Sequence, residues 1–277
     1  MNTFQDHNVN WAIKCPLSLN YAISLIIAVL MAVVSIAGFQ YRTAIYPTEE
    51  LRQAFVPNDI VNLFLGVPIL LGSMWLTWRG KLIGLLCWPG ALFFVLYNYI
   101  AYAFAMPLGW AFLAHLVLVM LSVYALISLV ASIDGKAVQQ RLASAVPEKF
   151  AGAVLVGLGL LFSLRVIGII ASAILNGISL PETELAVSVA DFLTTPAWII
   201  GGVLLWRRKE PGYASGLGLL FQGSMLFIGL IVVMLLQPLL NTAPLAITDV
   251  IVIAAMGLIY FVPFILFARG VISGREG

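Results

Sequence analysis

The chain alternates between long uncharged apolar runs and short polar segments. The eight apolar runs cover residues 19–39, 60–78, 82–104, 108–133, 150–175, 185–206, 213–236 and 246–267. Because a helix rises 1.5 Å per residue, each run is long enough to cross ~30 Å of hydrocarbon. The runs lack the period-two alternation of membrane strands, so we expect eight transmembrane helices. The segment 40–58, with Glu49 and Glu50, is expected to be an outer loop.

Composition agrees with a membrane protein. Hydrophobic residues make up 62% of the chain and charged residues 9%, against roughly 45–50% and about 25% in soluble domains. The lipid bilayer is therefore the expected partner. The first run, ahead of a passable cleavage signal at Ser35-Ile36-Ala37, could belong to a signal peptide. We interpret it as a span, because it is long and matches the run 150–175.

One stretch of sequence occurs twice. The letters PTEEL at Pro47 precede a Trp-Arg pair at Trp78, and PETEL at Pro181 precedes a Trp-Arg pair at Trp206. The separations of 134 and 128 residues differ by what short insertions produce in a duplicated unit. The second spans of both units contain a proline, which predicts a shared kink, and each third span begins with a GxxxG pattern, which favours close packing. These residues are Pro68 and Pro196, then Gly80, Gly84, Gly212 and Gly216.

The predicted fold is therefore an all-α polytopic membrane protein made of two parallel four-helix repeats. The repeats are residues 1–133 and 150–277, joined by a cytoplasmic linker, residues 134–149. Because each repeat has an even number of spans, both share one orientation, and a pseudo-two-fold axis along the membrane normal relates them.

Loop charge predicts the orientation. Alternate loops on one side hold only Arg42 and Arg52. The other side holds Lys14, Arg79, Lys81, Lys136, Arg141, Lys149, Arg207, Arg208, Lys209, Arg269 and Arg275. The positive-inside rule then makes both termini cytoplasmic, in the plasma (inner) membrane.

The inventory of reactive residues disfavours several functions. The net charge of +2 comes without a basic block, so nucleic acid is not an expected partner. The cysteines, Cys15 and Cys87, and the histidines, His7 and His115, are too few and too scattered for a metal or redox cofactor. We expect no cofactor and no metal, and the sequence indicates no protein partner.

Ionisable groups inside the membrane are the best pointers to function, because each is costly in hydrocarbon. Arg165 and Asp191 both lie 16 residues from the cytoplasmic charges, roughly 24 Å above them, so we expect them to pair. Asn98 falls in the same layer and His115 slightly further out. Asp59, at the outer interface after Pro57-Asn58, reads as a helix cap more readily than as a ligand.

Helical spacing brings these residues to one interior. We expect a polar pocket open to the outside, above an apolar inner half. Its predicted residues are Arg165, Asp191, Asn98, Tyr102, His115, Asp59 and Asn62. The Arg165–Asp191 pair could equally lock two helices together, and His115 could be a packing residue.

Three functions fit this pattern. The first is transport or binding of a small solute or ion. The second is an enzyme acting on a lipid-linked substrate at the outer leaflet, with His115, Asp59, Asp191 and Arg165 as acid, base and phosphate contacts. No GxSxG or HExxH motif accompanies them, so the sequence leans away from an enzyme. The third is a non-catalytic scaffold or assembly subunit of a membrane complex.

Overall fold

The computed structural model describes residues 9–240 and 247–273, in which eight helical segments are long and apolar enough to span a membrane and no strand occurs. The chain is an integral, multi-pass membrane protein. His7, Ala246 and Arg275, used above, lie outside the described residues. The spans are α1 (Ser18–Gln40), α3 (Glu49–Val61) continued by η2 (Asn62–Gly66) and α4 (Val67–Trp78), α5 (Leu82–Ala105), α6 (Trp110–Ser132), α8 (Glu148–Asn176), α9 (Glu182–Trp206), α10 (Glu210–Leu240) and α11 (Ile247–Ser273).

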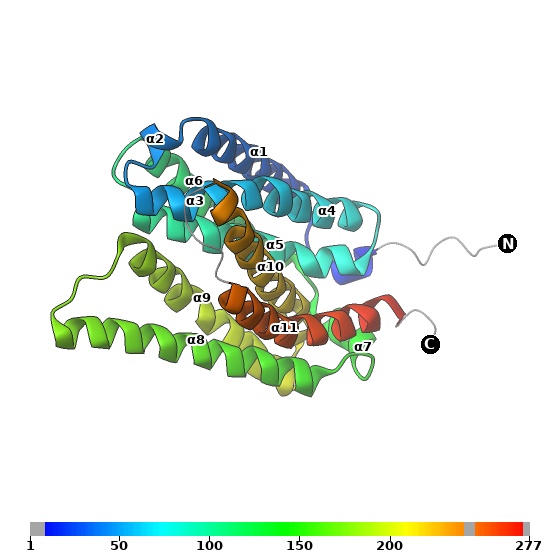
Figure 1. The fold of residues 1–277 in the computed structure, drawn as a ribbon. Helices are drawn as coiled ribbons and strands as arrows, with labels where there is room; N and C mark the ends of the chain where they lie inside the picture. Colours follow the sequence, from blue (N-terminus) through cyan, green and yellow to red (C-terminus); the bar gives the residue numbers. More distant parts are fainter. Residues whose placement is uncertain (1–8, 241–246, 274–277) are drawn as a thin grey trace.

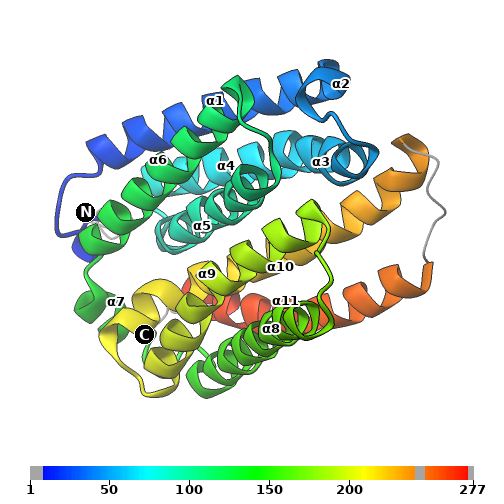
Figure 2. The same ribbon diagram turned by 90° about the vertical axis from the view of Figure 1, so that its left-hand side faces the viewer.

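Two helices form the centre of the bundle. Helix α5 packs against α4, α6, α9 and α10, and α10 packs against α3, α5, α9 and α11. Figure 2 shows α1, α4, α5 and α6 on one side and α8 to α11 on the other, with α5 and α10 meeting between them. We call residues 9–132 the first half and residues 148–273 the second half. Nearly every residue of α5 is buried, so the core lies where the halves meet.

Both ends of the described chain lie at the same end of the bundle (Figure 1). There η1 (Val9–Ala12) is tied to the end of α6, because Asp134 N donates to Ala12 O at 2.7 Å and Lys14 N to Ser132 O at 2.8 Å. The linker forms a short helix, α7 (Gly135–Leu142), whose first N–H groups are capped by Asp134. We call this the inner end and the opposite end, with α2 (Arg42–Ile45), the outer end.

The expected outer loop 40–58 is wrong, because a helix begins at Glu49. Thr48 caps that helix by accepting from Leu51 N at 3.2 Å, and acidic residues in its first turn favour its N-terminus. Asp59 lies ten residues further along, so it does not cap the helix as expected. The segment is polar on average, which hid a helix whose apolar side is buried.

The two prolines of the second spans have different surroundings. Pro68 follows η2, a π-helical turn, and Pro196 lies inside the continuous α-helix α9. Pro68 has no N–H for the carbonyl four residues before it, and its ring crowds that group, so the wider turn fits the backbone around it. The shared kink predicted from both prolines thus takes the form of a π turn in α3–α4.

Close helix approaches depend on particular glycines. A Cβ on Gly84 would overlap the backbone of Thr77, and one on Gly212 would overlap Leu205, so each brings two consecutive spans together at the inner end. Gly80 does not pack between helices as its GxxxG pattern suggested. It lies in the α4–α5 turn with φ +73°, a conformation that glycine adopts without strain.

Candidate functional site

A buried carboxylate is held by two tyrosines in the first half. The Tyr46 hydroxyl donates to Asp59 Oδ2 at 2.6 Å and the Tyr102 hydroxyl to Asp59 Oδ1 at 2.8 Å. Burial, and then the neighbouring Asp59 charge, raises the pKa of Tyr46 well above its usual value, so its phenol keeps the proton that it donates. Gly38 lies so close that a Cβ there would overlap Asp59 and Tyr46. The carboxylate is thus enclosed between α1, α3 and α5.

Aromatic rings extend this arrangement, which we call the Asp59 cluster. The ring centroid of His115 lies 4.9 Å from that of Tyr102 and 5.6 Å from that of Tyr99. Asn62 Nδ2 donates to the Tyr102 hydroxyl at 3.4 Å. His115 Nδ1 and the Tyr99 hydroxyl are buried without a partner among the described residues. The cluster is sealed, so its groups serve packing better than they serve a reaction in solvent.

A cavity of about 310 Å³ lies between the halves, in the outer half of the bundle. Helices α3 and α5 form one wall, and α9 and α10, with Phe162 of α8, form the other. Most of its surface is aromatic or aliphatic, with a few polar side chains among them. The residues used below are Phe94, Tyr97, Asn98, Phe162, Asp191, Trp198, Phe227, Thr183 and Gln237. Asn58 also lines it, and Asn58 Nδ2 donates to Asn98 Oδ1 at 3.1 Å.

Asp191 is the one ionisable acid or base among the side chains that line this cavity. Its Oδ1 accepts from the Tyr97 hydroxyl at 2.9 Å, and its Oδ2 lies 3.5 Å from Arg165 Nη1. The predicted ion pair is therefore confirmed. The partners differ in surroundings, since the Asp191 side chain is 9% exposed and the Arg165 side chain 49%. Arg165 does not line the cavity, so it reaches the carboxylate from outside it.

Two polar contacts join the halves where the cavity approaches the outer end. Glu50 Oε1 accepts from both the backbone N–H and the hydroxyl of Thr183, at 3.1 and 2.5 Å. Gln237 Nε2 donates to the carbonyl of Gln53 at 3.4 Å. Thr183 and Gln237 also line the cavity. We call these two contacts the outer latches, because they tie α3 to α9 and to α10.

The deep end of the cavity holds a polar group that the sequence analysis missed. Trp198 lines the cavity, and its indole N–H donates to Gln222 Oε1 at 2.7 Å. Gln222 is fully buried about 12 residues along α10, near the middle of the span. This bond fixes the tryptophan ring against the cavity. It also corrects the expectation that the bundle below the pocket is wholly apolar.

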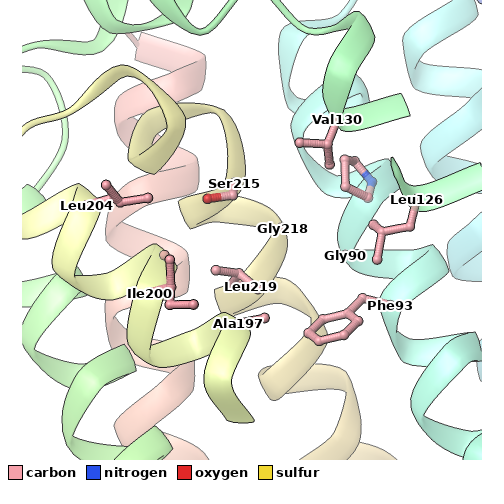
Figure 3. Close-up of a pocket in the computed structure, with 12 residues that line it drawn as sticks. Gly90, Phe93, Leu126, Val130, Ala197, Ile200, Leu204, Ser215, Gly218 and Leu219 are labelled. Carbon is pink, nitrogen blue, oxygen red and sulfur yellow. The ribbon is translucent and has the colours of Figure 1, made fainter. Parts of the chain in front are cut away.

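A second cavity, of about 330 Å³, lies in the inner half over the crossing of α5 and α10 (Figure 3). Phe93, Leu126, Ile200 and Leu219 are typical of its lining. Its one polar side chain, Ser215, already donates to Pro211 O at 2.8 Å. Because polar groups that fix a ligand are found in the outer cavity, the outer cavity is the candidate site.

The seven predicted site residues fall into two neighbouring arrangements instead of one pocket. Asp191 and Asn98 line the outer cavity, and Arg165 contacts Asp191 from outside. Asp59, Asn62, Tyr102 and His115 belong to the Asp59 cluster. Asn98 and Tyr102 are one turn apart, yet Asn98 meets the cavity and Tyr102 meets Asp59, because α5 is surrounded on all sides.

The aromatic lining was not identified from the sequence. In a chain with 12% aromatic residues, nothing distinguishes Phe94, Phe162, Trp198 and Phe227 from ordinary core or lipid-facing positions. Tyr97 precedes a predicted site residue, but it was interpreted as part of an aromatic belt.

No family model, no curated protein and no solved structure matches the chain. The function is therefore argued from the geometry of the outer cavity.

Proposed function

We propose that the protein binds a small solute in the outer cavity and carries it across the membrane. The observation that supports this most directly is the position of the cavity, between two helical halves with Asp191 in its wall. A site between two bodies can change its access when one body moves against the other, as in transporters built from repeats. A cavity of about 310 Å³ is at the lower end of ligand pockets, which suits a small solute.

The enzyme alternative has less support. It requires His115 and Asp59 to act with Asp191 and Arg165 on one substrate. Asp59 and His115 are both buried in the Asp59 cluster, and neither lines the cavity that Asp191 lines. The scaffold alternative gives no reason for a cavity with a carboxylate in its wall.

The proposal includes a duplicated architecture with a pseudo-two-fold axis along the membrane normal. The α4–α5 and α9–α10 turns support it, because the letters WRGK from Trp78 and WRRK from Trp206 are 128 residues apart. Backbone hydrogen bonds repeat at that spacing: Lys81 N donates to Leu76 O, and Lys209 N donates to Leu204 O. Each turn contains one residue of positive φ, Gly80 and Arg208, again 128 apart.

The proposed orientation places the inner end in the cytoplasm and the protein in the plasma membrane. The basic residues of the alternate loops support this, because they gather at the inner end around α7 and the α4–α5 and α9–α10 turns. The cavity then opens toward the outside of the cell, and the outer latches lie at its entrance.

Solute binding and uptake can be tested on the full chain. We expect uptake into proteoliposomes that Asp191→Asn abolishes while the variant stays folded. Glu182→Gln is the matched control, because it makes the same change at an exposed residue of α9 outside the cavity lining. Unchanged uptake in Asp191→Asn, or an equal loss in Glu182→Gln, would count against the proposal.

A further inference from the structure

We propose that the outer cavity selects an organic cation, a small protonated or quaternary amine with an apolar body. The inference rests on the proposed function, and it names the class of solute.

The sign of the charge follows from which side chains line the cavity. Asp191 is in the wall, whereas no lysine, arginine or histidine of the described chain lines it. A carboxylate in surroundings of low polarity favours a cation and repels an anion. Arg165 does not change this, because it approaches Asp191 from the α8–α9 side, where it lines a different surface with Gly168 and Glu184.

The walls add a second preference for positive charge. Phe94 and Tyr97 of α5 face the cavity from one side, and Trp198 and Phe227 face it from the other. The faces of aromatic rings carry partial negative charge and attract ammonium groups, tryptophan most strongly. The Trp198 ring is fixed by its bond to Gln222, so it is already in place before a ligand binds. The same rings would cover the apolar body of an amine.

Asp191 can exchange its present partner for a ligand. The Arg165 contact is long, at 3.5 Å, and half of the Arg165 side chain is exposed, which is the geometry of a weak ion pair. An ammonium inside the cavity would meet the same oxygen under more complete burial and would displace the guanidinium. Tyr97 would keep its hydrogen bond to the other oxygen and hold the carboxylate in position.

The test uses three probes that share a benzene ring and differ in charge: 2-phenylethylamine, which is protonated at neutral pH, 2-phenylethanol and phenylacetate. Binding to the full chain in nanodiscs is measured by titration calorimetry, with empty nanodiscs as the baseline for partitioning into lipid. We expect the amine to bind at least about tenfold more tightly than the alcohol, and phenylacetate to bind most weakly.

The variants separate charge from shape. Asp191→Asn should weaken amine binding by about tenfold to a hundredfold and leave the alcohol nearly unchanged. Arg165→Gln should strengthen amine binding about two- to fivefold, because it removes a competitor, an effect that a purely structural ion pair would not produce. Should either single variant fold poorly, Asp191→Asn combined with Arg165→Gln removes both charges together and should bind amine and alcohol alike.

The results also separate this inference from the proposed function. Phe227→Leu, which alters the cavity wall, should weaken every ligand that binds there. If the alcohol or phenylacetate binds as tightly as the amine and Phe227→Leu weakens it, the cation preference is overturned while solute binding stands. If none of the three probes binds above the baseline and uptake is also absent, both are overturned.

Discussion

Gly90 of α5 and Gly218 of α10 pack backbone against backbone at the centre of the bundle. A Cβ on Gly90 would overlap the carbonyl oxygen of Gly218, and one on Gly218 would lie 2.9 Å from the carbonyl oxygen of Leu86. The two helices that join the halves therefore touch where neither carries a side chain. Such a contact brings the helices close together, and no interdigitated side chains resist a change in their crossing angle.

Replacing Gly90 by alanine should destabilise the protein by about 1–3 kcal/mol, because the methyl group has backbone on its far side and must force the helices apart. The measurement is thermal unfolding in detergent. Gly157→Ala is the matched control, since Gly157 lies in α8 with no atom within 4 Å of its would-be Cβ. It should be neutral or slightly stabilising. Equal behaviour of the two variants would contradict the close contact.

Removing one phenol from the Asp59 cluster should be costly, and removing its neighbour should not. Tyr102→Phe deletes a buried hydrogen bond to a carboxylate and should lower the free energy of unfolding by about 1.5–3 kcal/mol. Tyr99→Phe deletes a buried hydroxyl with no partner among the described residues and should change it little. Comparable losses in both variants would show that the hydrogen bond to Asp59 does not matter for stability.

The Arg165–Asp191 pair should contribute little to stability. Because the separation is 3.5 Å and Arg165 is half exposed, a double-mutant cycle with Arg165→Gln and Asp191→Asn should give a coupling of at most about 1 kcal/mol. The readout is the free energy of unfolding of the four proteins. A coupling of several kcal/mol would mark the pair as a structural lock and would weaken the argument for its exchange with a ligand.

The native cysteines report the orientation without any mutation. Cys15 is exposed at the inner end and Cys87 is buried. A membrane-impermeant maleimide should therefore leave intact cells unlabelled and should label Cys15 once the inner face is made accessible. Glu182→Cys, at the outer end, is the positive control and should react in intact cells. Labelling of the unmodified chain from outside would reverse the proposed topology.

Hydrophobic runs predicted the spans well, because length and lack of charge are the requirements that a bilayer imposes. They failed at α3, where Glu49, Arg52 and Asp59 made a helix look like a loop. That helix buries its apolar side in protein and begins at the outer surface, so hydropathy does not mark its start. The π turn before Pro68 was also not predicted, since a proline indicates a disturbed helix without saying which form the disturbance takes.

The candidate site was predicted only as far as charge reveals it. Arg165 and Asp191 stood out because ionisable groups are rare in spans, and equal depth on consecutive helices predicted their contact. Phe227 could not be found in this way, because which rings face a cavity depends on how α10 is rotated in the bundle. The separation of Asp59 from Asp191 likewise depends on which side of α5 each side chain meets.

The space beside Gly38 has a consequence for the natural history of this chain. A methyl group at that position would occupy the volume of the Asp59 carboxylate and the Tyr46 hydroxyl. In descendants of a common ancestor, a larger residue at position 38 is therefore tolerable only after the acid has been lost, and the glycine should persist wherever the acid does. A set of orthologues in which position 38 varies freely beside an unchanged aspartate would be at odds with this packing.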